Sequence, residues 1–430
     1  MSSITVIQLV VLLGTMLVLM LLRFPVFLSM ILSSAVFMLI YPGSMPVAVI
    51  GQGIVSGINN ISFAAIAFYF MLGEIMNSTG LSERLVAFLD SIVGHIRGSL
   101  SHINIIASMV FAGVSGSSVA DTASIGSLMI PMMKKQGYPA GYAAAITEVS
   151  SIIGPIIPPS GTFILMAIYF NCSVRKMFIG GIVPGLLLGI FELVISVVIS
   201  KRRNFPKTDW RGWSFVGKRF KEGFAAFLLP LLVMVCLLTG FGTVVEIGAF
   251  SCVIALILAR TYERITLKDV FKMLIRAAGS TATITILLSV AGVFNWLIAS
   301  LGVSNWIAGQ LKVMGTSTFV VVGFCMVVLF FLGMILDNLV LQTVIVPVMA
   351  PTILALGIDP IWFGVVATLV IMIGLNTPPV GGLIYMTASI AKCPSSEVIK
   401  ESMPFIAGNV ILVAILLLIP QLVSYLPSIF

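Results

Sequence analysis

Long apolar runs cover most of this 430-residue chain and are separated by short polar or glycine-rich stretches. A helix that crosses the hydrocarbon core of a bilayer needs ~20 apolar residues at ~1.5 Å each. The pattern therefore predicts an all-α polytopic membrane protein with roughly ten to twelve helices plus two re-entrant hairpins. The clearest apolar runs are Ile4–Leu22, Phe163–Phe170, Ile182–Ile199, Phe224–Leu238, Gly248–Leu258, Phe319–Leu332 and Ile406–Ile419.

Two pairs of polar stretches, rich in glycine or proline, interrupt this pattern at matching places. Residues 113–121 and 154–161 form the first pair, and residues 333–338 and 374–381 form the second, about 220 residues later. Backbone that leaves the helix inside a membrane is tolerated where it lines a protein cavity. Broken segments at corresponding positions of two halves point to a transport site near the bilayer midplane.

A collinear series of matches supports an internal repeat. The pairs are separated by 216 to 222 residues and are Gly80 and Gly302, Pro131 and Pro347, Gly137 and Gly357, Thr147 and Thr368, Pro158 and Pro378, and Cys172 and Cys393. Each half then consists of scaffold helices, a short helix, a re-entrant helical hairpin, a Pro-broken helix and a returning helix. In the first half the short helix, Ser82–Ile96, has an amphipathic pattern suited to the membrane interface.

The predicted organisation has three parts. Residues 1–200 form the first repeat, with a hairpin tip at 113–122 and a broken helix at 150–162. Residues 201–222 form a basic linker, and residues 223–430 form the second repeat. In the second repeat the tip is expected at 332–340 and the broken helix at 374–382.

Composition excludes a soluble domain. Hydrophobic residues make up 59% of the chain and charged residues only 9%, against about 25% charged in soluble domains. The first apolar run lacks the basic flank and cleavage site of a signal peptide, so it is expected to remain as a helix. The five cysteines have no metal-binding spacing and are interpreted as buried thiols.

The net charge of +8 is concentrated in the linker. Eight of the 23 basic residues lie there: Lys201, Arg202, Arg203, Lys207, Arg211, Lys218, Arg219 and Lys221. The positive-inside rule places such a loop in the cytoplasm, and a nucleic-acid patch is the competing interpretation. Both chain ends lack basic residues over residues 1–22 and 424–430, which predicts external termini and inverted halves.

The motifs resemble those of a known family. Residues 113–121, 137–139 and 154–160, with 357–360 and 374–381 in the second half, are similar to the large membrane subunit of TRAP transporters, the tripartite ATP-independent periplasmic transporters. The resemblance implies a multi-pass protein of the bacterial inner membrane that imports organic acids on a sodium gradient by an elevator mechanism. C4-dicarboxylates, sialic acids and sugar acids are the substrate types, and Na⁺ is the coupling ion, with no other cofactor.

The resemblance also implies partners. These are a periplasmic substrate-binding protein and a small four-helix membrane subunit. Since only Ile4–Leu22 precedes Arg23, that subunit is expected to be a separate chain. Nucleic acid is not an expected partner.

Two sodium sites follow from the same resemblance. Carried over by motif, the first uses Ser115 and Ser118 with the backbone of Gly154, Ile157 and Pro159. The second uses Gly333 with Gly374, Thr377 and Val380. Glycine at such tips permits close approach and unusual backbone angles. Close packing of small residues between membrane helices is the alternative interpretation.

Substrate candidates follow from charge. An anion gains from the free amides at half-helix N-termini, and an ionisable residue inside a membrane is a functional candidate. Asp337 is expected to organise its tip or orient a cation ligand, because a carboxylate repels an acid. The candidates are Ser117, Ser160, Gly161, Asp337, Asn338 and Thr377.

Three other functions are alternatives to this interpretation. The string Gly113-Val114-Ser115-Gly116 matches an intramembrane serine protease motif, but both histidines, His95 and His102, lie upstream in the same region. A passive channel would need filter rings from several subunits. A stand-alone sodium/dicarboxylate symporter of related fold differs by not needing a binding protein.

Overall fold

The structure is a computed structural model that describes residues 3–43, 46–115, 117–262, 265–303, 309 and 317–430. These residues form helices and loops, with no strand among the described segments. The helices of the first half are α1 (Ser3–Leu21), α2 (Val26–Ile40), α3 (Val47–Ser56), α4 (Ser62–Ser78), α5 (Leu81–Val93), α6 (Ser99–Ser115), α7 (Ser118–Lys135), α8 (Ala140–Ser151), α9 (Gly161–Tyr169) and α10 (Val174–Arg202).

The second half begins after the basic linker. Its helices are α11 (Trp213–Thr239), α12 (Val244–Tyr262), α13 (Leu267–Ser300), α15 (Thr318–Gly333), α16 (Asn338–Val340), the π-helix η1 (Leu341–Ile345), α17 (Val346–Ala355), α18 (Pro360–Leu375), α19 (Gly382–Ala391), α20 (Ser395–Leu418) and α21 (Gln421–Ile429). The all-α fold class is confirmed.

Glycine and proline divide many of the apolar segments. Among the described residues, five continuous helical segments are long and apolar enough to cross a membrane, or six if the bent α11 counts as one span. This is fewer than the roughly ten to twelve predicted. Six further apolar helices of 10–17 described residues, such as Val26–Ile40 and Pro360–Leu375, are shorter than these spans.

The order of hairpin, broken helix and returning helix occurs twice. The first copy is α6 to α10 and the second is α15 to α20. Gly137 before α8 and Gly357 before α18 both have positive φ, +91° and +68°. The Pro158-Pro159 and Pro378-Pro379 bonds are both cis. The helix ends on either side of the four breaks are Ser115 and Ser118, Ser151 and Gly161, Gly333 and Asn338, and Leu375 and Gly382.

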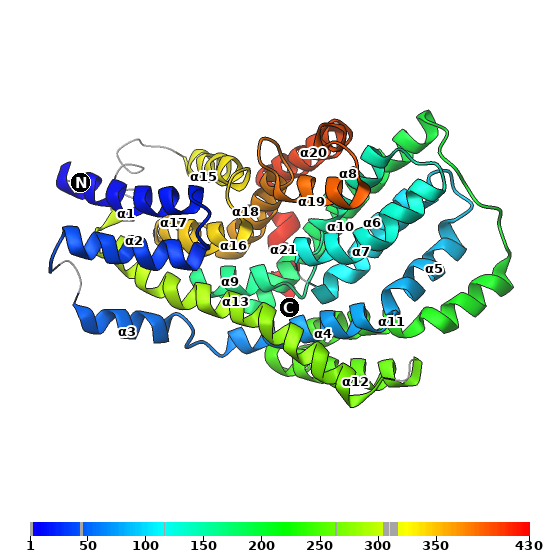
Figure 1. Ribbon diagram of the computed structural model, residues 1–430, viewed down its shortest axis with the longest axis horizontal. Helices are drawn as coiled ribbons and strands as arrows, with labels where there is room; N and C mark the ends of the chain where they lie inside the picture. The colour runs from blue at the N-terminus through cyan, green and yellow to red at the C-terminus, as the bar shows by residue number, and fades with distance from the viewer. Residues whose placement is uncertain (1–2, 44–45, 116, 263–264, 304–308, 310–316) are drawn as a thin grey trace.

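Two groups of helices pack against each other. In Figure 1, α3, α4, α11 and α12 follow the lower edge, and α15, α18, α19 and α20 lie along the upper side. The long helix α13 packs against α2, α3 and α4. The first hairpin and the broken helices pack together, with α8 in contact with α6, α7, α19 and α20. We call α3, α4 and α11 to α13 the scaffold group and the hairpins with the broken helices the core group.

The helix after Gly80 starts close to its predicted position. Gly80 has φ +62° and precedes α5, whose Phe88 ring lies 5.7 Å from the Phe227 ring of α11. The linker is shorter than predicted, because α10 continues to Arg202 and α11 begins at Trp213. Arg203 forms an ion pair with Glu401 at 2.8 Å, which joins the start of the linker to α20.

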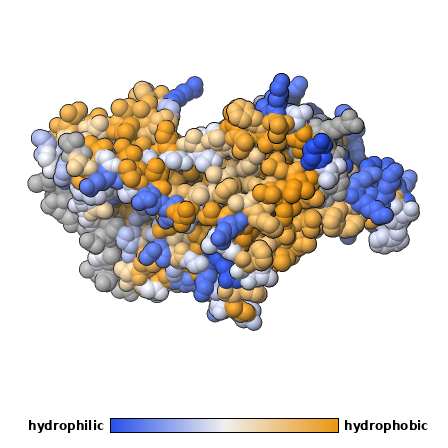
Figure 2. Space-filling view, turned by 90° about the horizontal axis from the view of Figure 1, so that it is seen from below, coloured by the Kyte–Doolittle hydropathy of each residue, from blue (hydrophilic) through white to orange (hydrophobic). Residues whose placement is uncertain are grey.

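The surface is largely apolar. Figure 2 shows one face covered by hydrophobic residues, with hydrophilic residues gathered in separate patches. Large side chains such as Leu39 and Ile61 are about four-fifths exposed, at 81% and 80%. A water-soluble surface rarely carries contiguous apolar patches of this kind, whereas contact with lipid stabilises them.

The fold depends on close packing at the first broken helix. A methyl group at Gly181 of α10 would lie 2.2 Å from Phe163 Cε2 and 2.5 Å from the carbonyl oxygen of Ile156. Gly181→Ala is therefore expected to destabilise the protein by about 1–3 kcal/mol. The thermal unfolding midpoint of the purified protein in detergent measures this change.

Gly279→Ala on α13 is the matched control, because nothing lies within 4 Å of an added methyl group there. Alanine favours a helix over glycine by up to about 1 kcal/mol, so this control should unfold at the same or a higher temperature. Equal midpoints for Gly181→Ala and the wild type would contradict the packing.

Candidate functional site

The first hairpin turns at Ser117. The helix α6 ends at Ser115 and α7 begins at Ser118, while the Ser117 hydroxyl accepts a hydrogen bond from Ala120 N at 3.4 Å. Ser117 is therefore the N-cap of α7. Ser118 is buried in the first turn. Gly116 and the side chain of Ser115 lie outside the described part of the chain.

The first broken helix is buried, and side chains of the same segment form hydrogen bonds with its backbone. Residues 152–160 connect α8 to α9 and are all buried. The hydroxyls of Ser160 and Thr162 both donate to the Pro155 carbonyl oxygen, at 2.6 and 3.1 Å. Ser160 also caps α9 by accepting from Phe163 N at 3.4 Å. The side chains supply the partners that the interrupted helix lacks.

The first tip and the first broken helix are in contact. Thr122 of α7 donates to Ser151 Oγ at 2.8 Å, and a methyl group at Gly154 would lie 3.0 Å from Asp121 Oδ2. Gly154, a member of the predicted first sodium site, thus lies beside Asp121 of the first tip. Two further members, Ile157 and Pro159, are buried.

The second hairpin has a more irregular tip. Its α15 ends at Gly333, and Asp337 Oδ1 accepts a hydrogen bond from Leu339 N at 2.9 Å as the N-cap of α16. Asn338 Oδ1 accepts from Gln342 Nε2 at 2.9 Å. The helix continues through the π-helix η1 into α17. Single π-helical turns in longer helices are frequent at functional sites.

The second tip lies against the second broken helix, backbone to backbone. A methyl group at Gly374 would lie 2.7 Å from the Phe330 carbonyl oxygen and 2.9 Å from Gly333 Cα. Neither Gly333 nor Gly374 has a positive φ, so close approach alone requires glycine there. The expectation of unusual backbone angles does not hold at these two positions.

The other members of the predicted second sodium site differ in position. The Thr377 amide donates to Gly374 O at 2.8 Å, and its hydroxyl donates to Ile373 O at 2.6 Å. Thr377 therefore closes the end of α18. Val380 is 45% exposed, which places its side chain at the surface of the break.

The two broken helices meet each other. Asn376 Nδ2, at the C-cap of α18, donates to the Glu148 carbonyl oxygen of α8 at 3.1 Å. Asn376 and Glu148 are both buried. This contact joins two breaks that lie 228 residues apart in the chain.

Both tips open on one cavity of about 410 Å³. Four of the six substrate candidates line it, namely Ser117, Gly161, Asp337 and Asn338. Ser160 and Thr377 do not line it, and their hydroxyls donate to the Pro155 and Ile373 carbonyl oxygens. The cavity is therefore formed by both hairpins and by the start of α9.

The far wall of the cavity was not predicted. It comes from α4 and α13 of the scaffold group, through Glu74, Asn77, Ser280 and Thr283. Asn77 Oδ1 also accepts from Ser124 Oγ of α7 at 2.9 Å. Glu74 could have been found from the sequence, because it is an acidic residue in the otherwise apolar segment Ser62–Ser78.

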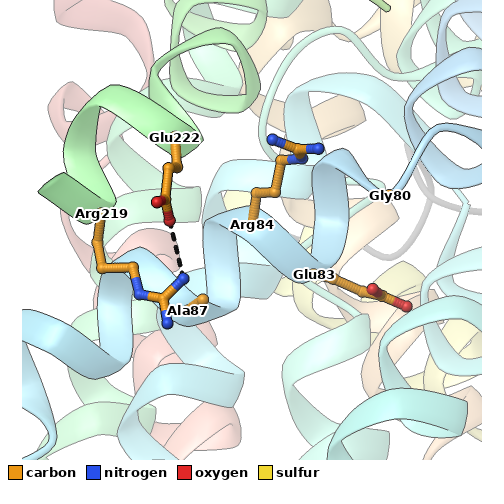
Figure 3. A pocket seen from close by; sticks show the side chains of 6 residues that line it. All are labelled: Gly80, Glu83, Arg84, Ala87, Arg219 and Glu222. Atoms are coloured by element: carbon orange, nitrogen blue, oxygen red, sulfur yellow. Dashed lines mark hydrogen bonds and ion pairs between the residues drawn. The ribbon is translucent and has the colours of Figure 1, made fainter. Parts of the chain in front are cut away.

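A second cavity, of about 370 Å³, lies between α5 and α11. Figure 3 shows its charged lining, in which Arg219 and Glu222 form an ion pair at 2.8 Å. Of the repeat positions only Gly80 lines it. Neither tip contributes to this cavity, so it is separate from the candidate site.

The serine protease arrangement is not formed. His102 Nδ1 lies 3.0 Å from Ser196 Oγ and His102 Nε2 lies 3.1 Å from the Arg97 carbonyl oxygen. His102 precedes Ser115 by 13 residues in the same helix, which at 1.5 Å a residue separates them by about 20 Å. The other histidine, His95, packs edge-on against Trp210.

Helices that break at matching positions around a shared cavity are typical of a membrane transport protein. The comparison with protein families agrees and is more specific. The chain belongs to the family described as "Tripartite ATP-independent periplasmic transporter, DctM component", whose sequence model matches residues 13–422. The family is that of the predicted resemblance, and it consists of transporter permeases, not enzymes.

Individual relatives extend over nearly the whole chain. The sialic acid TRAP transporter large permease protein SiaM of Vibrio cholerae is 33% identical over 94% of this chain and 95% of its own. The 2,3-diketo-L-gulonate TRAP transporter large permease protein YiaN of Escherichia coli is 32% identical over 88% of this chain and 89% of its own.

A solved structure shares the fold. The YdaH transporter of Alcanivorax borkumensis, whose crystal structure was described as having an unusual topology, matches with a TM-score of 0.63. The match covers 85% of this chain and 86% of that one at 14% sequence identity. At this identity the likeness concerns the fold alone.

The close contact between Gly333 and Gly374 leaves no room for a side chain. Gly374→Val places three carbons where the Phe330 carbonyl and Gly333 stand, so the tip must separate from the broken helix. Substrate uptake by cells that carry this variant is expected to be lost, although the chain still reaches the membrane. Uptake is measured against the amount of chain in the membrane fraction.

Gly323→Val is the control on the same hairpin leg, because nothing lies within 4 Å of an added Cβ at Gly323. It should retain most of the uptake. Wild-type uptake by Gly374→Val would show that the approach of these two backbones is dispensable.

Proposed function

We propose that this chain is the permease subunit of a sodium-driven, binding-protein-dependent importer of organic acids. The observation that carries the proposal is the single cavity on which both hairpin tips open, walled by α4 and α13. Sialic acids, sugar acids and C4-dicarboxylates are the proposed substrate types. Two of these correspond to the substrates in the names of the relatives from Vibrio cholerae and Escherichia coli.

The proposed coupling ions lie behind the tips. Na⁺ is a hard cation that binds oxygen ligands, and carbonyls at helix breaks inside a membrane supply them. The contacts of Asp121 with Gly154 and of Gly333 with Gly374 support one site beside each tip. The first proposed site uses Ser115, Ser118, Gly154, Ile157 and Pro159.

The second proposed site uses Gly333, Gly374, Thr377 and Val380. In it, the Gly374 carbonyl accepts from Thr377 N, and a carbonyl oxygen has a second lone pair for a cation. The side chain of Val380 is exposed and has no ligand atom, so its backbone oxygen is the group that would bind Na⁺.

The proposed motion is an elevator movement of the core group against the scaffold group. Its support is the division of the cavity wall, since Glu74 and Ser280 come from the scaffold and Ser117 and Asp337 from the tips. The linker is proposed to be cytoplasmic and both termini periplasmic, on the charge distribution. A periplasmic binding protein and a small four-helix subunit, as a separate chain, are the proposed partners.

Sodium dependence tests the coupling. Because two cations are expected to bind for each substrate, uptake into proteoliposomes by the assembled transporter should require an inward Na⁺ gradient, with a Hill coefficient above one. Choline replaces sodium in the control. Equal uptake in choline, or with a proton gradient alone, would exclude sodium coupling.

Dependence on partners separates the proposal from a stand-alone symporter. This chain alone, purified and reconstituted, is expected to give no uptake, because substrate delivery requires the binding protein. Adding the small subunit and the binding protein should restore uptake. Robust transport by the isolated chain would instead support the symporter.

A further inference from the structure

The charges around the cavity are unbalanced for a site that holds an anion. Two carboxylates line it, Glu74 and Asp337, and no basic side chain belongs to the lining within the described part of the chain. Asp337 caps α16 through Leu339 N. An acid that enters this cavity faces two negative groups, and like charges at close range repel.

One cation stands at the margin of the cavity. Arg276 Nη1 lies 2.9 Å from Glu74 Oε1, and Ser78 Oγ donates to the same oxygen at 2.8 Å. Arg276 immediately precedes Ala277 on α13 and lies one turn before Ser280, and both of these line the cavity. The guanidinium is therefore held at the edge of the cavity by a residue of its wall.

The ion pair is too exposed to serve mainly for folding. The Arg276 side chain is 65% exposed and that of Glu74 is 21% exposed. Ion pairs with such exposure contribute little to stability. The helices α4 and α13 also pack against each other, and both carry buried apolar residues such as Ile66 and Leu287. Joining the two helices is therefore not the main role of the Arg276–Glu74 ion pair.

Arginine is suited to bind a second carboxylate. The guanidinium carries five N–H donors in a planar fork that fits a carboxylate with two parallel hydrogen bonds. Glu74 engages Nη1. A substrate carboxylate at the margin of the cavity would require the same donors and the same positive charge.

We propose that Arg276 binds the carboxylate of the substrate and that Glu74 is the competing counter-ion, which holds the guanidinium in place until substrate arrives. This inference rests on the proposed transport of organic acids and names a residue that determines the preference for an acid. Because Arg276 belongs to α13 of the scaffold group, the contact comes from the scaffold side of the cavity margin, whereas Ser117 and Asn338 belong to the tips.

The test compares the effects on acid binding of removing each charge of the pair separately. Binding of N-acetylneuraminate, D-gluconate and succinate to the purified full chain in sodium buffer is measured by titration calorimetry for wild type, Arg276→Gln and Glu74→Gln. Arg276→Gln should raise Kd about fivefold, and Glu74→Gln should lower Kd about threefold, as expected for a partly exposed ion pair. Both variants lose the same ion pair, so a purely structural role would move Kd in one direction for both.

Lys272→Gln is the matched control. Lys272 lies one turn before Arg276 on α13, is 68% exposed and pairs with Asp269 at 3.7 Å. It removes the same charge from the same helix and should leave Kd within about twofold, because it does not touch the cavity. Arg276→Lys keeps the charge without the fork, so it should weaken binding less than Arg276→Gln, and it provides the same test if Arg276→Gln unfolds.

Two results would overturn the inference in distinguishable ways. If wild type binds one of the acids and both variants of the pair change Kd in the same direction or not at all, the role of Arg276 is wrong and the proposed function stands. If wild type binds none of the three acids, the inference is overturned, whereas the proposed function is decided separately by uptake through the transporter assembled with its binding protein.

Discussion

Backbone amides and carbonyls inside a bilayer find no water, so every break in a membrane helix must be satisfied by the protein itself. The first broken helix meets this requirement with the hydroxyls of Ser160 and Thr162, which both donate to the Pro155 carbonyl. The second tip uses the Asp337 carboxylate as the cap of α16. Because these partners are local, the chain can leave the helix at the depth where a transport site is needed and remain folded there.

The same constraint determines how the breaks pack. An irregular segment inside a membrane needs partners from the protein, and here each tip contacts the broken helix of its own half. Gly333 and Gly374 touch through their backbones, and Asn376 donates to the Glu148 carbonyl from the other half of the chain. The two broken helices thus meet through the buried pair Asn376 and Glu148, and both tips line the cavity.

Charged residues make up only 9% of this protein, and they are concentrated at particular places. Most basic residues of the linker are exposed on the surface, whereas Glu74 and Asp337 line the cavity. A cavity with two carboxylates suits cations more than acids, so an acidic substrate needs compensation from bound Na⁺, from helix N-termini or from Arg276 at the margin. The pairing of Arg276 with Glu74 keeps that positive charge beside the cavity.

The sequence by itself determined where the chain breaks. Glycine, proline and hydroxyl residues at 113–121, 154–161, 333–338 and 374–381 have local backbone preferences that interrupt an apolar helix, and α6, α8, α15 and α18 each end within or just before these stretches. Only the tertiary structure decided which side chains face the cavity. Ser160 and Thr377 turn to their own helices, and the wall that completes the site comes from α4 and α13, whose Glu74 and Arg276 are 202 residues apart. Hydropathy and turn preference depend on neighbours in sequence, whereas a cavity depends on how distant helices pack, which no local pattern records.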